Sequence, residues 1–548
     1  MSRIVKFFSC LIAGLLASVA VAHDQAYLLN MYHFNIQYVA GSEKAMRKNV
    51  EQSFVPLVEF YLDHPGWGAD FEMQGQYIEY LAQEYPEELA KFRQLVNSGQ
   101  CELVSFHYSD QFLLAFPAHD EERSLEISDD VLAQNNIRRS GVIFTQEAQF
   151  GEGICDMGRR HGYTVAVMNY DLYRWFEDDD RYPYYTLRGI DVIEKRDADK
   201  PGSGIRVKWL FLGDGELVVT GGLSPYFAGL FKVRKSRLNS LEKKLKGFES
   251  RGYKIATVSE YHAALQKAGV KPGHLKPILD APWRPEDDDG IYTWLGKYVF
   301  PWEEDYALRT ENFRTRALLI QAERQGVPLA RMKDAWKHQL NAEVTDTTGW
   351  SPFPVEIRYG HEESDMVRRE VKRLCPECSI PDFPFSGIIL SRAEWPIPVS
   401  IRGSARDTSI SIKKAAELES LWIIEASWRE SRYSSGTSAL VFPLFEPVIA
   451  YSPAMLEREI RRVLSSEIKA QSFHLALANG LIGLGRNYYL IRENLTGVLA
   501  ARPDMEKGEV CFEVKGARSR EFKLRFLLIR GAERQAIDLA NRINLIRP

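Results

Sequence analysis

The sequence predicts an α/β protein that begins with a parallel barrel, closed or nearly closed, and continues with a helical region and a C-terminal β-sandwich. Three observations predict this fold class. Strand-like and helix-like segments alternate between residues 26 and 268, as in repeated β-α units. Two strongly helical segments follow, and short β-rich runs replace them from about residue 381. With 548 residues, the chain is also too long for one ordinary hydrophobic core.

The predicted barrel covers residues 23–275. Its seven strand candidates are short runs rich in β-branched and aromatic residues: 27–33, 69–73, 101–106, 141–145, 164–168, 207–211 and 254–258. Helical patterns separate them, including residues 75–97 and 236–251, each followed by a glycine. Seven strands in a segment of roughly 240 residues favour a barrel over an open sheet.

The rest of the chain divides into two predicted domains. Residues 276–380 form a helical region, with helices predicted over residues 305–325 and 329–341. Residues 381–548 contain short β-rich runs separated by turn residues: 387–390, 397–401, 420–426, 439–442, 487–492, 509–514 and 522–528. Such a series is typical of an antiparallel sandwich.

The N-terminus has the three parts of a secretory signal. Arg3 and Lys6 are basic, residues 7–21 are apolar, and an A-x-A cleavage site ends at Ala22. We therefore expect residues 1–22 to be removed and the protein to be periplasmic or secreted. Elsewhere the sequence has no apolar run long enough for a membrane span, so none is expected after cleavage.

The net charge and the cysteines argue against two kinds of ligand, nucleic acid and a structural zinc ion. A formal charge of -4 gives no general attraction to nucleic acid. Cys375 and Cys378 form the motif Cys-Pro-Glu-Cys. A local disulfide or two idle thiols is favoured over half of a zinc knuckle, since the sequence lacks a second pair to complete four ligands. The sequence does not predict the oligomeric state.

Polar or ionisable residues follow five of the predicted barrel strands. In chain order they include His33, Glu79, the pair His107 and Asp110, Glu147 and Asp214. The C-terminal ends of parallel barrel strands meet on one face, where such proteins carry their functional groups. We therefore expect these side chains to lie around one site.

Two facing carboxylates are what cleavage of a glycosidic bond requires, one attacking the anomeric carbon and one protonating the leaving oxygen. We assign Glu147 as the nucleophile and Asp214 as the general acid/base. Glu216 competes with Asp214, because alternation along a strand would place both side chains on one face. His33, Glu79, His107 and Asp110 are expected to bind sugar hydroxyls or to orient the two carboxylates.

The barrel segment resembles glycoside hydrolase family 57. The matching motifs are HFNIQY, GQYIEYL, CELVSFHYSDQF, FTQEAQF and GDGELVVTGG, and they occur in the order of the family. The resemblance implies an incomplete (β/α)7 barrel and cleavage or transfer of α-glucans with retention. It also implies the nucleophile role for Glu147 and the acid/base role for Asp214. The chain departs from the family in reading HFN where His-Gln-Pro is usual, and in having Phe144 where Trp is usual.

A second pattern, AEVTDTTGW, is similar to a signature of the clan-related family 38 α-mannosidases, which bind zinc. In that family the metal is held by His-x-Asp in the first motif, the nucleophile and a later His. This chain has His33 and Asn35, then Glu147, and Glu343 or Val344 at the later position. Such a set is poor in zinc ligands, so the sequence predicts metal-independent chemistry with no cofactor. Asp346 within the same pattern is expected to line the pocket.

Two tryptophans of the loop region, Trp283 and Trp294, are candidates for stacking on sugar rings, although packing in the helical layer is an equal alternative. The acidic run 287–289 is interpreted as a solvated loop rather than a Ca²⁺ site, because the EF-hand spacing is absent.

The sequence therefore predicts an exported, retaining glycoside hydrolase or transglycosylase with an oligo- or polysaccharide substrate. One alternative is a metal-dependent polysaccharide deacetylase, for which no His-x-x-x-His motif is present. A second is a non-catalytic carbohydrate-binding protein on the same barrel, and a third is a structural envelope protein. The sugar, its linkage and endo or exo action are not predicted.

Overall fold

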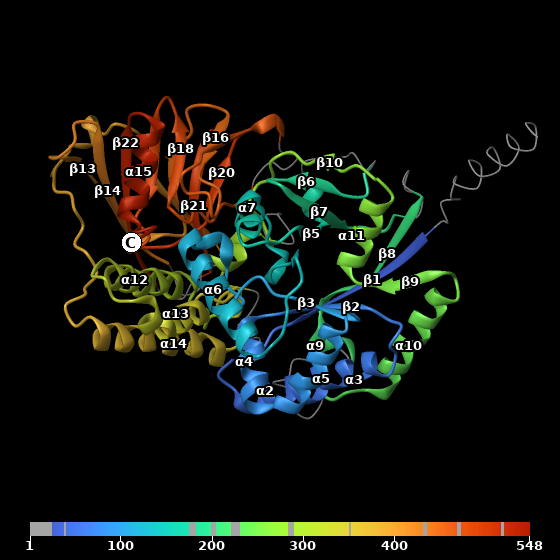
Figure 1. Ribbon diagram of the computed structural model, residues 1–548. Coiled ribbons are helices and arrows are strands. Elements are labelled where there is room, and N and C mark those ends of the chain that lie inside the picture. Colours follow the sequence, from blue (N-terminus) through green and yellow to red (C-terminus); the bar gives the residue numbers. More distant parts are fainter. Residues whose placement is uncertain are drawn as a thin grey trace, which may run out of the picture.

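The computed structural model describes residues 25–37, 40–174, 182–198, 204–220, 231–282, 290–349, 352–430, 436–467, 473–516 and 520–548. The predicted signal segment, residues 1–22, lies outside these ranges, so the structure does not test it. A barrel-like α/β region, a layer of helices and a pair of antiparallel sheets follow one another along the chain (Figure 1). Within the described ranges, no helix combines the length and the apolar character needed to cross a membrane.

Two sheets, mostly parallel, build the N-terminal region. The first contains β3 (Cys101–Val104), β2 (Ala69–Met73), β1 (Gln25–Phe34) and β8 (Ile205–Asp214) in that order, and β9 (Tyr253–Ala256) also pairs with β1. The second has the order β10 (Gly273–His274), β6 (Tyr185–Leu187), β7 (Ile190–Lys195), β5 (Val165–Asn169) and β4 (Val142–Ile143). Every predicted strand range overlaps one of these strands.

Two bridges join the two sheets. Leu103 of β3 forms a parallel bridge with Arg139, three residues before β4 begins. Ala198, which follows β7, forms an antiparallel bridge with Val207 of β8. The strands therefore curve into a barrel-like arrangement. The β6–β7 hairpin is not predicted from the sequence, because its strands are short and only Arg188 and Gly189 separate them.

Helices pack against the two sheets. They include α2 (Glu43–Asn49), α3 (Val55–Leu62), α4 (Gly75–Glu84), α5 (Pro86–Asn97), α6 (Ala118–Gln134), α7 (Glu152–Arg160), α10 (Lys235–Glu249) and α11 (Val258–Lys267). The helix predicted over residues 75–97 is in fact two helices. Pro86 lies in the first turn of α5, and Tyr85 before it has the non-helical angles φ -136° and ψ 52°. Proline lacks a backbone N–H and disfavours a helical conformation in the residue before it, so the helix breaks there.

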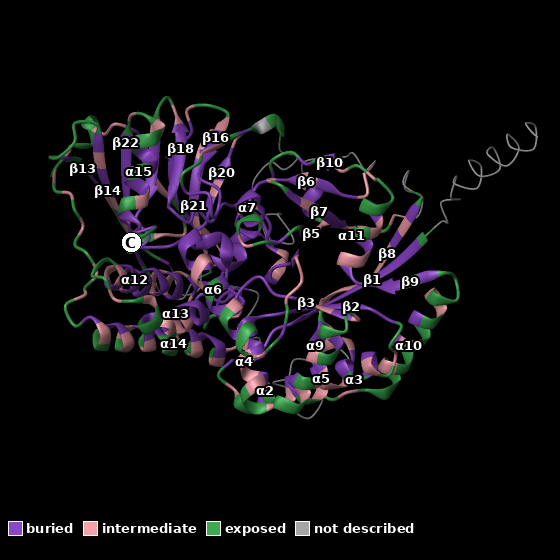
Figure 2. Cartoon of the chain, viewed as in Figure 1, coloured by how far each residue is buried: buried purple, intermediate pink, exposed green. Residues whose placement is uncertain are grey.

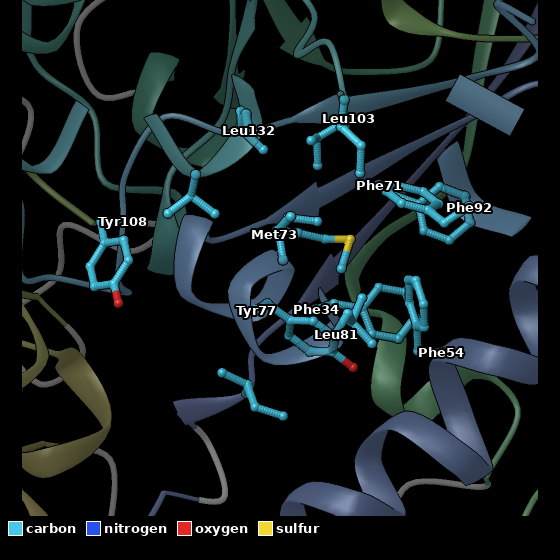
Figure 3. Packing of buried hydrophobic residues seen from close by; sticks show 14 of the residues in the cluster. Phe34, Phe54, Phe71, Met73, Tyr77, Leu81, Phe92, Leu103, Tyr108 and Leu132 are labelled. Atoms are coloured by element: carbon cyan, nitrogen blue, oxygen red, sulfur yellow. The ribbon is translucent and has the colours of Figure 1, made fainter. Parts of the chain in front are cut away.

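Aromatic side chains fill the core between the first sheet and its helices. Phe34 of β1 stacks on Phe71 of β2, with ring centroids 5.9 Å apart. Phe54 and Phe92, from the helical side, meet Phe71 edge to face (Figure 3). The alternation along β1 thus points Phe34 into this core, while His33 before it points to the opposite face of the sheet. Packing of the aromatic residues fixes the direction of the neighbouring polar side chain.

Three long helices form the layer after the barrel-like region: α12 (Asp305–Arg324), α13 (Leu329–Ala342) and α14 (Pro354–Leu374). The first two match the predicted ranges, whereas α14 was not among the predicted helices. Arg309 of α12 is fully buried and donates to the Val344 carbonyl over 2.7 Å and to Thr348 Oγ1. After α14, Cys375 and Cys378 form a disulfide, one of the two states that the sequence favoured over half of a zinc knuckle.

The C-terminal region consists of two antiparallel sheets. The larger has the order β11 (Gly387–Ile389), β13 (Arg406–Ala415), β14 (Leu421–Arg429), β22 (Glu521–Arg530), β19 (Tyr488–Arg492), β18 (Leu481–Gly485), β16 (Val448–Tyr451) and β17 (Arg461–Leu464). The smaller has the order β12 (Ser400–Gly403), β15 (Thr437–Pro443), β21 (Glu509–Lys515) and β20 (Ala501–Asp504).

Both sheets contribute to one apolar core, in which Trp428 and Phe526 of the larger sheet meet Phe442 and Phe512 of the smaller. Helix α15 (Glu533–Ile543), which is not predicted from the sequence, packs on the other face of the larger sheet. Figure 2 shows most of these strands as buried.

Candidate active site

A cavity of about 530 Å³ opens at the C-terminal ends of the parallel strands. Its wall contains His33 and Asn35 at the end of β1, residues 144 and 146–148 after β4, Asn169, Lys195, residues 212–214, Glu216, Trp294, residues 345, 346, 348 and 349, and residues 352, 353 and 356. Five strand ends and two segments of the helical region therefore share one wall. This is the face of a parallel barrel on which functional groups are expected.

Glu147 lies on a tight turn directly after β4. The residue has φ 55° and ψ 22°, and Ala148 after it has φ 47°, so two successive non-glycine residues adopt the left-handed conformation. Hydrogen bonds hold the turn: the Ala148 amide donates to the Thr145 carbonyl over 2.9 Å, and Thr145 Oγ1 donates to the Gln149 carbonyl. Residues other than glycine rarely adopt this conformation unless the surrounding structure fixes it, and such residues cluster at functional sites. The turn presents the half-buried Glu147 to the cavity.

Asp214 and Glu216 also line the cavity but have different surroundings. Asp214 ends β8 and is exposed, while Glu216 is 2% exposed in the short helix α9 (Gly215–Val218). Because the strand stops at Asp214, the expected alternation that placed both side chains on one strand face is wrong. Glu216 accepts a hydrogen bond from the Asn35 amide. Burial raises the pKa of Glu216 to about 8, while nearby His33 acts to lower it.

Asp346 reaches the cavity from the helical region, as the sequence predicts. It lies on a short turn, η6 (Thr345–Thr347), and accepts a hydrogen bond from Asn35 Nδ2 over 2.6 Å. Burial raises the pKa of Asp346 to about 6, and the bond from Asn35 opposes that rise. Thr345 ties the turn to the barrel-like region, since its amide donates to the Asp110 carbonyl and its Oγ1 accepts from Gln146 Nε2.

His33 is buried between two carboxylates of neighbouring strands. In the sheet it pairs with Glu72 of β2 on one side and with Asp214 of β8 on the other. His33 Nδ1 is hydrogen-bonded to Glu72 Oε2. Burial disfavours the imidazolium, but the charge and the hydrogen bond of Glu72 raise the pKa of His33 well above its ordinary value. Glu72 therefore orients a side chain that faces the cavity.

His107 and Asp110 lie under the cavity wall rather than in it. β3 ends at Val104, so both residues belong to the following loop, and both are fully buried. Their side chains lie beside Glu72 and His33, and we call these four residues the buried cluster. Burial raises the pKa of Asp110 well above its ordinary value and lowers the pKa of His107 to about 4.

Glu79, another predicted site residue, is not in the cavity wall. Glu79 lies on α4 and contacts Lys337 Nζ at 2.5 Å and the Tyr108 hydroxyl at 2.7 Å, away from the residues that line the cavity. Side chains of a helix that follows a strand point in several directions. The place of Glu79 in the GQYIEYL motif therefore does not ensure that its side chain faces the cavity. Trp283 and the acidic run 287–289 lie outside the described residues. Trp294 lines the cavity but is 1% exposed and packs near Phe112.

Glu72, Asn35, Lys195 and Asn169 are site residues that the sequence analysis did not assign. Glu72 carries the clearest signal, because it is a charge within the short strand ADFEM, all of whose residues are buried. An acidic residue inside a fully buried strand requires a partner. Asn169 and Lys195 end β5 and β7 and could have been found by the same rule of strand ends that found Glu147.

The positions of the family 38 zinc ligands do not come together here. Glu343 is fully buried, bonded to Gln111 and Gln339 at 2.8 Å each, and is not in the cavity wall. The side-chain amide of Asn35 donates to Asp346, and an amide nitrogen is not a metal ligand. The four residues that occupy those positions therefore do not fit a zinc ion of that kind.

The overall architecture is shared with a solved carbohydrate-active enzyme. The crystal structure of an alpha-mannosidase from Enterococcus faecalis aligns with a TM-score of 0.60, over 96% of this chain and 89% of that chain, at 8% sequence identity. At that identity the likeness shows the fold alone.

The sequence comparison is more specific for the first part of the chain. Residues 20–193 match the model of Glycosyl hydrolase family 57, which confirms the resemblance over the stretch that contains Glu147, while Asp214 lies beyond it. An alpha-amylase from Pyrococcus horikoshii is 22% identical over 164 residues, covering 29% of this chain and 25% of the relative. A 4-alpha-glucanotransferase from Thermococcus litoralis is 22% identical over 245 residues, covering 44% of this chain and 32% of the relative. The matches thus span a quarter to a third of the length of these relatives.

Proposed function

We propose that the protein is a glycoside hydrolase or transglycosylase that acts on an α-glucan-type oligo- or polysaccharide with retention of the anomeric configuration. One observation carries the proposal: Glu147 and Asp214, from the ends of β4 and β8, line the same cavity. Retaining enzymes need two carboxyl groups on either side of the scissile bond, about 5–5.5 Å apart. The alpha-amylase and glucanotransferase relatives support the choice of α-glucans.

The proposed reaction has two displacement steps. A Glu147 carboxylate oxygen attacks the anomeric carbon, while the bond from that carbon to the leaving oxygen breaks and the leaving oxygen takes a proton from the general acid. The product is a glycosyl ester of Glu147 and a free sugar. Water or a second sugar hydroxyl then attacks the anomeric carbon. It gives its proton to the residue that acted as the general acid in the first step, and Glu147 is released as a carboxylate. Water gives hydrolysis, and a sugar gives transfer.

Asp214 is the proposed acid/base, and Glu216 is a buried neighbour of it. Asp214 is exposed within the cavity and therefore accessible to a leaving group, whereas Glu216 is buried and already accepts the Asn35 amide. Burial raises the pKa of Glu216 to about 8, so this carboxyl group is protonated and uncharged at neutral pH. Asp346 is proposed to bind sugar hydroxyls, since it is a polar group in the wall, whereas the two ring nitrogens of His33 face Glu72 and Asp110.

The finer architecture is also a proposal. We infer an incomplete (β/α)7 barrel made of β1, β2, β3, β4, β5, β7 and β8, in which β7 takes the place that the strand at 254–258 held in the sequence prediction. The bridges from Leu103 to Arg139 and from Ala198 to Val207 support this order.

Export to the periplasm or the medium is proposed from residues 1–22 alone. Expression with the native N-terminus, followed by fractionation and N-terminal sequencing, is expected to give mature protein starting near His23. Intact precursor in the cytoplasmic fraction would contradict export.

The decisive experiment is a substrate screen read by product anomer. The purified protein is incubated with α-glucans, mannans and β-glucans, and the first product is followed by NMR. We expect activity on an α-glucan with an α-configured initial product, and a glycosyl ester on Glu147 that can be trapped with a fluorinated substrate. An inverted product, or a label on another residue, would overturn the mechanism. Release of acetate from an acetylated polysaccharide without any glycosidic cleavage would favour the deacetylase alternative instead.

A further inference from the structure

The buried cluster lies where three neighbouring strands end. His33 comes from β1, Glu72 from β2, and His107 and Asp110 from the loop after β3. Glu72, His107 and Asp110 are fully buried, and the His33 side chain is 9% exposed on the cavity side. The cluster contains two imidazoles and two carboxylates.

The spacing of the cluster suits a single ion. One ligand atom from each of His33, Glu72 and Asp110 can be chosen so that all three lie within 4.8 Å of one another. His33 Nε2 lies 4.0 Å from Asp110 Oδ2. Two ligands of a tetrahedral zinc ion, at bond lengths of about 2.1 Å, are separated by roughly 3.4 Å. His33 Nδ1 is hydrogen-bonded to Glu72 Oε2, so an ion shared by the three residues would replace that hydrogen bond and draw the side chains closer together.

His107 and Gln74 surround the carboxylates, and Gln74 Nε2 donates a hydrogen bond to Asp110 Oδ2. His107 Nε2 lies 3.5 Å from Glu72 Oε1, and His107 Nδ1 lies 3.6 Å from Asp110 Oδ1. The ring thus spans the two carboxylates that would be ligands. Metal-bound carboxylates are commonly held by a hydrogen bond from a residue outside the coordination shell, which fixes their orientation.

Polar atoms in the cluster are left without hydrogen bonds. They are His33 Nε2, Glu72 Oε1, Asp110 Oδ1 and both ring nitrogens of His107. Buried polar atoms in native proteins are nearly always satisfied, and a group of exceptions in one place calls for an ion or water. Within the described part of the chain, the ion pairs of Glu72 and Asp110 involve only His33 and His107, and neither lysine nor arginine.

We propose that His33, Glu72 and Asp110 bind one divalent transition-metal ion of the zinc class, with His107 positioning the two carboxylates. Imidazole nitrogen and carboxylate oxygen are ligands that zinc accepts readily, and a divalent charge offsets both carboxylates. The ion would join the ends of β1, β2 and β3 below the cavity floor. This set differs from the family 38 positions, with which it shares only His33, and it is independent of the Glu147 and Asp214 chemistry.

The test uses the full-length mature protein and added metal ions alone. The protein is stripped with EDTA, dialysed against ZnCl2 and desalted, and its zinc content is measured by inductively coupled plasma mass spectrometry. We expect one zinc per chain and an increase in thermal midpoint relative to the stripped protein. With Co²⁺ in place of zinc, we expect the visible absorption of a four- or five-coordinate site containing nitrogen. Less than a tenth of an equivalent with no thermal shift would overturn the proposal.

Variants locate the ion. Asp110→Asn and Glu72→Gln are each expected to reduce zinc affinity at least tenfold and to change the cobalt spectrum. Asp70→Asn is the matched control, because Asp70 is a fully buried carboxylate on the same strand, outside the cluster. Equal zinc binding by Asp110→Asn, Glu72→Gln and the control would place the ion elsewhere and overturn the proposal. Should either variant not fold, the cobalt spectrum of the wild-type protein still decides, since a spectrum of hexaaquo-cobalt would contradict the site.

Discussion

The acidic residues at the strand ends form two layers that differ in their access to solvent. In the cavity wall, Glu147 is half-buried and Asp214 is exposed. One layer below, Glu72 and Asp110 are fully buried in the company of two histidines. A carboxylate that reacts with substrate must be reachable, whereas a carboxylate that is sealed off must be neutralised by a proton or a cation. The two layers are therefore suited to different tasks, one to chemistry and one to holding the strand ends in place.

The largest effect is expected at Glu147. Replacing it by glutamine removes the proposed nucleophile while keeping the shape of the turn. We expect turnover to fall by roughly 10⁴-fold or more, because loss of a nucleophile leaves only binding and residual electrostatic effects. Initial rates on the best α-glucan measure the loss, and thermal unfolding verifies that the fold is intact. Wild-type rates in a folded Glu147→Gln protein would refute the upper layer as the site of chemistry.

Variants of Asp214 and Glu216 test whether the exposed or the buried carboxyl group is the general acid. We expect Asp214→Asn to reduce turnover by about 10²–10⁴-fold, the usual contribution of general acid–base catalysis. A substrate with a good leaving group should restore much of the first step, because it no longer needs protonation. Glu216→Gln is expected to reduce turnover far less, since the glutamine side chain can still accept a hydrogen bond from the backbone N–H of Asn35. The reverse order of the two variants would assign the acid role to Glu216.

The lower layer can be tested through stability. Glu72→Gln leaves His33 without its carboxylate partner, and breaking one side of a buried ion pair costs about 3–5 kcal/mol. We expect the free energy of unfolding to fall by that amount in urea titrations that contain EDTA, which keeps metal ions out of the measurement. The same titration on Asp70→Asn shows whether any buried carboxylate of β2 has an equal effect. No loss of stability in Glu72→Gln would show that the pair contributes nothing to the fold.

The pH dependence of stability reports on Glu216, which is faced by Asn35, His33 and Asp214. Its pKa is raised from 4.5 to about 8, so the folded protein keeps a proton that the unfolded chain releases across this interval. The free energy of unfolding therefore falls as pH rises from 4.5 to about 8, with a contribution of at most about 1.4 kcal/mol per pH unit. Glu216→Gln should flatten this part of the curve. Parallel curves for the two proteins would contradict the raised pKa.

The smallest effect is expected at Glu79, which belongs to neither layer. Its side chain is 27% exposed and pairs with Lys337. Partly exposed ion pairs of this kind contribute about 0–1 kcal/mol. We expect Glu79→Gln to keep wild-type turnover and to lose no more than that amount of stability. A loss of activity above tenfold would return Glu79 to the active site, where its motif had placed it.

The upper layer could be predicted from the sequence because it depends on local order. A strand that ends in a polar residue identifies a position at the rim of a parallel barrel, and Glu147 and Asp214 were found in that way. The same rule found His33, which lines the cavity and also belongs to the lower layer. Asp346 was found through a motif rather than through geometry. The strand pairing that brings these ends together follows from the parallel arrangement itself.

The lower layer could not be predicted because it depends on distances between elements. Glu72 carries no turn or motif signal, and its role follows from the register that pairs it with His33. His107 and Asp110 were expected beside the substrate, but β3 ends at Val104 and the loop folds under the wall. The break of the helix at Pro86 was visible in the sequence, whereas the buried contact of Arg309 with residues 344 and 348 joins segments that no local pattern relates.

The turn that carries Asp346 has a consequence for how this site can change over evolutionary time. Residues 345, 346, 348, 349, 352, 353 and 356 form part of the cavity wall, and they lie far beyond residues 20–193, the stretch that matches the family model. Arg309 and Thr345 fasten that turn to the helical layer and to the loop after β3. Substitutions at the cavity-wall positions of this segment would change the shape of the pocket, while Glu147, the proposed nucleophile, lies inside the stretch that matches the family model. The pocket can thus change its shape through residues that lie outside the stretch shared with the family model.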